Sequence, residues 1–360
     1  MFKAQPRASG YFRTGYDRDL VLAETRLQRT SLAIFLFVLL VFPFVASPFQ
    51  LDLACQVYLA AIGSLSLMLL TGYAGQISLG HAGLIAAGAF TVGILAKELD
   101  APFWITLPTS AVVGVLLGVV FGLPSLRLRG LYLAVSTLAL HFVVVYLGGE
   151  YETKRGFSTG ITVDPPTLFG WPITSTRVWY FVLLAFAAAT LMICMNLLRS
   201  RTGRAWNAIR TRETVAEALG INVAGYKLFA FVISSAMTSV GGALFAYYRG
   251  FVSVEAFSLF LSISYVAMNI IGGMGSLLGA LLGAVFVTIF PYVIEAGLLS
   301  LPGAQRHAGQ LFAVNYAAFG LVMILFLVFE PLGLVGIWRR VQAYFLLWPF
   351  KHRPLAGTGQ

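Results

Sequence analysis

Long apolar runs without charged residues dominate this chain. Residues 53–96 and 256–294 contain no Lys, Arg, Asp or Glu, and each run is long enough for two membrane spans of about 20 residues. Six shorter runs each fit one span. The pattern therefore predicts ten spans, at residues 31–47, 53–71, 77–96, 103–123, 131–148, 178–198, 228–248, 257–272, 277–300 and 311–329.

The composition agrees with an all-α, polytopic integral membrane protein. Hydrophobic residues make up 59% of the chain and charged residues only 11%, which is too few charges for a soluble domain. The two cysteines, Cys55 and Cys194, lie inside apolar runs and offer neither a disulfide framework nor a metal site. The first 30 residues lack the pattern of a cleaved signal peptide, so we expect none.

The basic residues predict the orientation of the spans. If both termini are cytoplasmic, 18 of the 24 Lys and Arg residues fall on the cytoplasmic side, as membrane topology favours. Orientation explains the net charge of +10, so we expect lipid and no nucleic acid as a partner. We divide the chain into a basic cytoplasmic segment at 1–30, a transmembrane domain at 31–335 and a cytoplasmic tail at 336–360. The transmembrane domain contains an external segment at 149–177 and a cytoplasmic one at 199–227.

The cytoplasmic segment contains a predicted amphipathic helix at residues 204–220, RAWNAIRTRETVAEALG. Gly220 is expected to cap its C-terminus. Such a helix suits docking into a groove of a soluble partner, through its carboxylates and its alanine face. A basic helix lying on lipid headgroups is an equal alternative. The candidate docking residues are Arg204, Arg210, Arg212, Glu213, Glu217 and Gly220.

Two glycine-rich segments interrupt the predicted spans. Residues 72–83 read GYAGQISLGHAG, and residues 269–283 read NIIGGMGSLLGALLG. Broken backbone is tolerated at membrane depth only where protein or a wet cavity surrounds it, and transporters place substrates at such breaks. A tight turn capped by Ser78 is the simpler alternative for the first segment. The candidate substrate-pathway residues are Tyr73, Gln76, Ser78, His81, Asn269 and Ser276. The glycines spaced four apart, at 114, 118 and 122 and at 275, 279 and 283, predict close helix contacts.

The chain carries no ATP-binding or catalytic motif of its own. A Gly-x-x-x-x-Gly-Lys-Ser/Thr loop is absent from the sequence, and no nucleophile–base or metal-ligand pattern stands out. We therefore expect a non-catalytic transport subunit without a cofactor. An ion-coupled transporter is the alternative, with Glu295 as the proton-carrying group, although it lies near the outer end of its predicted span.

Three motifs resemble those of the LivM-type permeases of branched-chain amino-acid ABC importers. They are GYAGQISLGHA at 72–82, SRTGRAWNAIR at 200–210 with ALGIN at 218–222, and IGGMGSLLGA at 271–280. The resemblance spans residues 31–335. It implies a bacterial inner-membrane permease that imports branched-chain or related amino acids, with residues 204–220 contacting the ATPase.

The resemblance also implies the partners. They are a second permease of the LivH type, two cytoplasmic ATP-binding subunits, and a periplasmic or lipid-anchored substrate-binding protein. The external run KRGFSTGIT at 154–162 departs from the Thr-Gly-Gly…Asn-Gly pattern of the family. Relatives that carry urea or short amides therefore stay as alternatives for the substrate.

The charge distribution makes a prediction about which loops face the outside. In a variant with Cys55 and Cys194 replaced by Ser, a membrane-impermeant maleimide added to intact cells should label single cysteines at positions in 155–170. It should miss positions in 204–220 until the cells are permeabilised. The reverse labelling pattern would refute a cytoplasmic N-terminus.

Overall fold

A computed structural model describes residues 26–125, 131–157, 160–168, 171–299, 311–330 and 332–347. The chain divides into two compact units, residues 48–335 and the two end segments 1–47 and 336–360. The predicted cytoplasmic segment at 1–30 and the tail at 336–360 lie mostly outside the described residues. The two breaks and the cavities described below lie in the larger unit.

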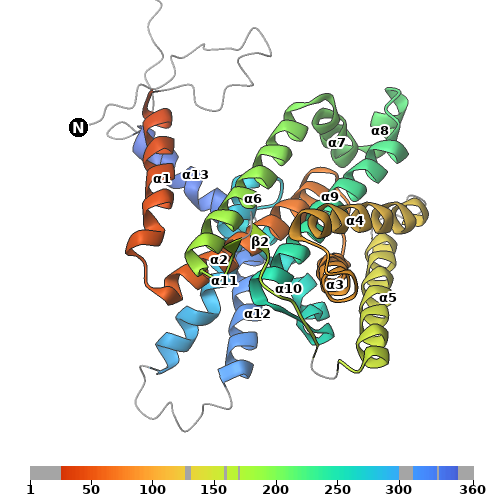
Figure 1. The fold of residues 1–360 in the computed structure, drawn as a ribbon. Helices are drawn as coiled ribbons and strands as arrows, with labels where there is room; N and C mark the ends of the chain where they lie inside the picture. The colour runs from red at the N-terminus through yellow and green to blue at the C-terminus, as the bar shows by residue number, and fades with distance from the viewer. Residues whose placement is uncertain are drawn as a thin grey trace, which may run out of the picture. The chain divides into compact units, whose positions relative to one another are not determined.

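The larger unit is built almost entirely from helices (Figure 1). The end segments contribute α1 (Arg26–Val45), and α13 (Gly333–Leu347) begins in the larger unit and continues into the tail. The other helices are α2 (Pro48–Leu67), the π-helix η2 (Met68–Tyr73), α3 (His81–Leu99), α4 (Phe103–Ser125), α5 (Leu131–Arg155), α6 (Thr176–Arg199), α7 (Arg201–Thr211), α8 (Glu213–Ala218), α9 (Val223–Arg249), the 3₁₀ helix η3 (Val254–Phe257), α10 (Leu259–Gly272), α11 (Leu277–Leu299) and α12 (Leu311–Phe329).

Two short antiparallel strand pairs accompany the helices. β1 (Ile161–Thr162) pairs with β4 (Phe251–Val252), with Ile161 opposite Val252. β2 (Thr167–Leu168) pairs with β3 (Trp171–Pro172). The first pair ties the segment after α5 to the end of α9.

Each of the ten predicted spans overlaps a helix, which confirms the all-α membrane architecture. Seven of the described helices are long and apolar enough to cross a bilayer, or eight if α12 and α13 form one bent span. α10 has only 14 residues and covers about 21 Å, less than the hydrocarbon core of about 30 Å. The exact number of spans stays a prediction.

Small residues allow the central helices to pack closely. α9 contacts α2, α3 and α4 (Figure 1). A Cβ atom at Gly88 or Gly242 would collide with the backbone carbonyls of Ser239 and Ile85, so only glycine fits where α3 crosses α9. Gly114 faces Ser235 of α9 in the same way. The predicted role of the 114–122 glycines in packing is confirmed. A Cβ atom at Gly279 or Gly283 of α11 would likewise collide with the backbone at the end of α10.

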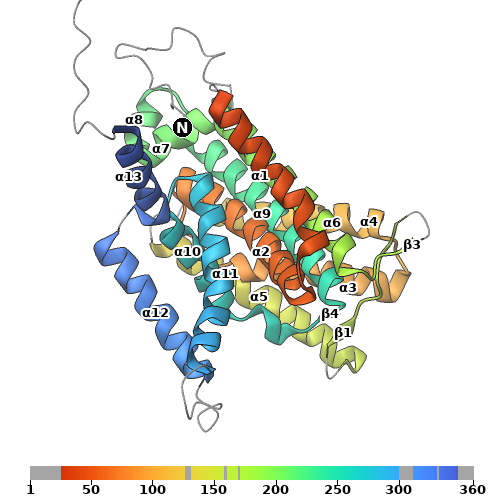
Figure 2. The ribbon, with the colours of Figure 1, turned by 90° about the vertical axis from the view of Figure 1, so that its left-hand side faces the viewer.

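The connections of the larger unit gather at two opposite ends (Figure 2). One end holds α7, α8 and the two glycine-rich breaks, which contact one another. The other end holds the β1–β4 pair and the Glu98–Arg155 salt bridge, at 2.8 Å. The predicted cytoplasmic segment at 199–227 therefore lies at one end of the larger unit, and the described part of the predicted external segment at 149–177 lies at the other.

The predicted single helix at 204–220 is wrong, because two helices occupy this segment. α7 ends at Thr211, Arg212 is extended (φ −154°, ψ 104°), and α8 follows. The Thr211 hydroxyl donates to the carbonyl of Asn207 at 2.8 Å, an interaction that bends helices. The expected cap is present: Gly220 has φ +82°, and its N–H and that of Ile221 bond to the carbonyls of Glu217 and Ala216.

The tight crossing of α3 and α9 predicts a large effect of one added methyl group. Gly242→Ala should lower the melting temperature of the purified protein, because overpacking costs about 1–3 kcal/mol. Gly297→Ala is the matched control, since a Cβ atom there meets nothing within 4 Å. Equal melting temperatures for the two variants would contradict the close contact.

Candidate functional site

The first break separates η2 from α3. Residues 74–80 are not helical, and Gly75 has a positive φ of +72°. Gln76 is buried, and its Nε2 donates to the backbone carbonyl of Lys227 at 2.9 Å. The amide side chain therefore holds the broken segment against the start of α9. The sequence correctly predicted an interrupted helix here.

Two buried polar side chains lie where α3 begins. Ser78 and His81 are 2% and 1% exposed, and Ser78 Oγ and His81 Nε2 have no hydrogen-bond partner among the described residues. The His81 ring packs edge-on against Tyr265 of α10, with ring centroids 4.8 Å apart. Gly80, and not Ser78, is the N-cap of α3, so the alternative of a Ser78-capped turn is wrong.

The start of α3 is held by hydroxyl groups from other helices. The backbone N–H of Ala82 donates to Ser262 Oγ of α10, and that of Leu79 donates to Thr137 Oγ1 of α5, each at 2.9 Å. These bonds replace the water that would satisfy a helix N-terminus at a surface. The broken segment is therefore built into the protein interior, as broken backbone in a membrane requires.

The second break joins α10 to α11. Gly273 and Gly275 both have positive φ, at +117° and +82°, which permits the sharp turn. Ser276 Oγ accepts the N–H of Gly279 at 3.3 Å and so caps α11. Asn269 is 2% exposed and accepts a hydrogen bond from Ser64 Oγ at 2.8 Å, while its Nδ2 has no partner in the part of the chain that the structure describes.

Arg210 of α7 connects the two breaks. Its guanidinium donates to the carbonyl of Gly72 at the end of η2. The same guanidinium lies against Gly275, where a Cβ atom would collide with it. Gly75 also packs against the Arg210 side chain. One side chain of the predicted cytoplasmic segment therefore touches both broken segments.

α7 is anchored in the core of the larger unit. Trp206 is fully buried in an apolar cluster with Met68, Leu69 and Phe231, and its Nε1 donates to the carbonyl of Tyr226 at 2.9 Å. Ala205 and Ile209 are buried as well. The apolar face of α7 thus packs against the chain's own helices. This face is therefore not available to dock into a partner's groove or to lie on lipid, which are the two alternatives that the sequence left open for the helix at 204–220.

The surface that remains open lies on and around α8. Val215 and Leu219 are 49% and 75% exposed, and Glu217 and Gly220 are exposed beside them. Glu213 instead forms a salt bridge with Lys227 at 2.8 Å. Arg204 and Arg212 are exposed, and Arg204 Nη1 donates to the carbonyl of Arg199 at 3.4 Å. Of the six predicted docking residues, Arg204, Arg210 and Glu213 therefore make side-chain contacts inside the larger unit.

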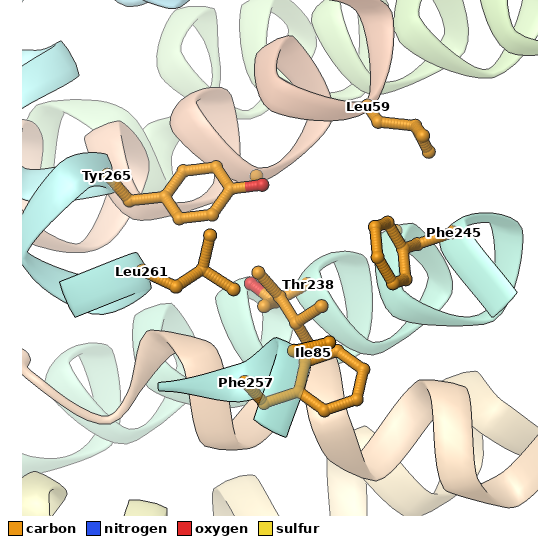
Figure 3. Close-up of a pocket in the computed structure, with 10 residues that line it drawn as sticks. Leu59, Ile85, Thr238, Phe245, Phe257, Leu261 and Tyr265 are labelled. Atoms are coloured by element: carbon orange, nitrogen blue, oxygen red, sulfur yellow. The ribbon is translucent and has the colours of Figure 1, made fainter. Parts of the chain in front are cut away.

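A central cavity of about 80 Å³ lies between α2, α3, α9, η3 and α10 (Figure 3). Its wall is mainly apolar, and Tyr265 and Thr238 supply the hydroxyl groups. The lining residues are Leu59, Gly63, Ile85, Thr238, Gly241, Phe245, Ala256, Phe257, Leu261 and Tyr265.

The sequence analysis missed the cavity residues. None of the predicted substrate-pathway residues lines this cavity: Tyr73, Gln76, Ser78, His81, Asn269 and Ser276. His81 packs edge-on against Tyr265, which does line it. A signal was present in α9, where Ser234, Ser235, Thr238 and Ser239 place four hydroxyls in an apolar helix. Tyr73 is half-buried beside the apolar cluster around Trp206.

The fold and its broken helices define a membrane permease, and comparison with known proteins identifies its family. Residues 49–328 match the model of the branched-chain amino acid transport system / permease component family. The high-affinity branched-chain amino acid transport system permease protein LivM of Salmonella typhimurium is 32% identical, over 88% of this chain and 77% of the relative. The chain belongs to this family of permease subunits.

More distant relatives show the range of the family. A probable branched-chain amino acid transport permease protein, LivH of Methanocaldococcus jannaschii, is 24% identical over 71% of this chain and 82% of its own length. The autoinducer 2 import system permease protein LsrC of Escherichia coli is 25% identical over 66% of this chain and 67% of its own length. No solved structure matches the chain significantly.

The contacts of Arg210 predict that it holds the two breaks in place. Arg210→Met should speed hydrogen exchange of backbone amides in 72–76 and 273–276 by about tenfold, because the charge-assisted hydrogen bond to Gly72 is lost. Exchange at the α3–α9 crossing should stay unchanged. Arg212→Met is the control, since Arg212 is exposed two residues further on. Equal exchange in both variants would show that Arg210 does not restrain the breaks.

Proposed function

We propose that this subunit imports branched-chain amino acids across the bacterial inner membrane, using ATP hydrolysed by partner subunits. The family match and the LivM relatives support the substrate class. The LivH relative supports a second, homologous permease as partner. Two cytoplasmic ATP-binding subunits and a periplasmic or lipid-anchored substrate-binding protein complete the proposed assembly.

The observation that carries the proposal is the contact of Arg210 with both broken segments. α8 offers an exposed surface with Val215 and Leu219 one helical turn apart, which suits a groove of an ATPase subunit. α7 directly precedes α8 in the chain, and its Arg210 contacts Gly72 and Gly275. Movement of the ATPase at α8 thus reaches the breaks through one short connection, which is what coupling requires.

The lining of the central cavity suits the apolar side chain of a branched-chain amino acid. Leucine, isoleucine and valine carry branched aliphatic groups, and the cavity presents leucine, isoleucine and phenylalanine side chains around a small space (Figure 3). The hydroxyls of Tyr265 and Thr238 give it two polar contacts. Pockets of this kind bind small ligands through an apolar wall with a few polar groups. Urea and short amides, which lack an aliphatic branch, fit this wall less well.

The ion-coupled alternative finds less support. Glu295 is exposed near the end of α11 and does not line the central cavity. Ionisable groups that couple protons to transport lie inside the membrane beside a paired charge. We therefore favour ATP as the energy source.

Substitutions on α8 test the coupling role. Val215→Ser with Leu219→Ser should abolish co-purification of the ATPase subunits and lower leucine uptake, because the exposed apolar contact is lost. Gly220→Val should weaken both more mildly, since its positive φ costs about 1 kcal/mol for other residues.

Leu99→Ser provides the control, because Leu99 is similarly exposed, at 69%, at the opposite end of α3. It should leave ATPase association at the parent level. Parent-level association and uptake in the α8 double variant would refute α8 as the ATPase contact.

A further inference from the structure

A second cavity lies at the β1–β4 end of the larger unit. Its volume is about 370 Å³, and it is lined by residues from α2, the 163–176 segment and the end of α9. The residues that matter for its chemistry are Asp52, Ile173, Trp179, Tyr247, Tyr248 and Arg249. Neither the sequence motifs nor the family comparison assigns it a role.

The cavity carries one negative and one positive side chain. The Asp52 carboxylate accepts hydrogen bonds from Gln56 Nε2, at 2.7 Å, and from the Tyr248 hydroxyl. A carboxylate has about four lone-pair sites, so Asp52 keeps capacity for a further donor. Arg249, the last residue of α9, is exposed and forms no ion pair with the described residues. A zwitterionic α-amino acid presents the complementary pair, an ammonium and a carboxylate.

Aromatic rings form part of the wall of this cavity. Trp179 packs edge-on against Tyr248, with ring centroids 5.8 Å apart, and its Nε1 donates to the carbonyl of Ile173 at 3.2 Å. Tyr247 is held by Thr106 through a hydroxyl contact of 2.7 Å. Such rings attract an ammonium at their faces and contact an aliphatic side chain without cost.

The same helix faces line this cavity and the central one. On α2, Asp52 lines the outer cavity, and Leu59 and Gly63 line the central one. Spacings of seven and four residues place all three on one side of the helix. On α9, Tyr248 faces the outer cavity and Phe245 the central one, three residues apart. The two cavities therefore follow one seam between α2 and α9.

We propose that the cavity at the β1–β4 end is an entry site for a free α-amino acid, in which Asp52 binds the ammonium and Arg249 the carboxylate. The inference rests on the proposed function, which supplies the amino-acid substrate. The Tyr248–Asp52 hydrogen bond joins α9 to α2 across the seam. A substrate ammonium that shares Asp52 with the Tyr248 hydroxyl weakens this link between the two helices.

The entry site is tested by measuring the ratio of leucine molecules imported to ATP molecules hydrolysed. The complete transporter is reconstituted in liposomes with a saturating amount of leucine-loaded binding protein. Asp52→Asn and Arg249→Gln should each lower this ratio by about tenfold, the effect of losing one charge-assisted hydrogen bond. Arg249→Lys should restore most of it, because the positive charge is kept. Glu295→Gln, an exposed carboxylate outside both cavities, should leave it unchanged.

Other outcomes would overturn the inference. An unchanged ratio in both charge-removing variants, with leucine import by the parent, would refute the entry site alone. A parallel loss of uptake and ATP hydrolysis, reversed by more binding protein, would show that Asp52 and Arg249 dock that protein instead. Failure of the parent to import leucine, isoleucine or valine would refute the proposed function as well.

Discussion

Satisfaction of backbone polar groups at helix ends is the constraint on which this structure depends. Both glycine-rich breaks leave N–H and C=O groups without partners in their own helices. The protein supplies these partners: Ser262 and Thr137 of other helices for the start of α3, Arg210 for the end of η2, and the adjacent Ser276 for the start of α11. Arg210 also contacts Gly275, so both breaks are tied to α7.

Close helix packing makes these ties possible. Side-chain hydroxyls reach a neighbouring backbone only when the helices approach closely, and glycines at the crossings permit that approach. Gly88 and Gly242 bring α3 against α9, and the same crossing lets Ser239 donate to the carbonyl of Leu84 at 3.0 Å. Small residues and buried hydroxyls thus work together in the core of the larger unit.

The sequence predicted the parts of the structure that depend on local pattern. The apolar runs located the helices, and the glycine clusters located the breaks, because length and backbone freedom are local properties. The division of 204–220 into two helices was missed, since it depends on tertiary burial of Trp206 and on the Thr211 hydroxyl. The cavity residues were missed for a similar reason. Thr238 and Tyr265 belong to different helices, and only the packing brings them to one space.

The extended residue Arg212 divides the 199–227 connection into two parts that are held differently. α7 is held against the core of the larger unit by the burial of Trp206 and by the Arg210 contacts. α8 follows a single extended residue, and the Glu213–Lys227 ion pair ties it to α9. Rotation about the backbone of Arg212 would therefore change the direction of α8 while α7 keeps its contacts with both breaks.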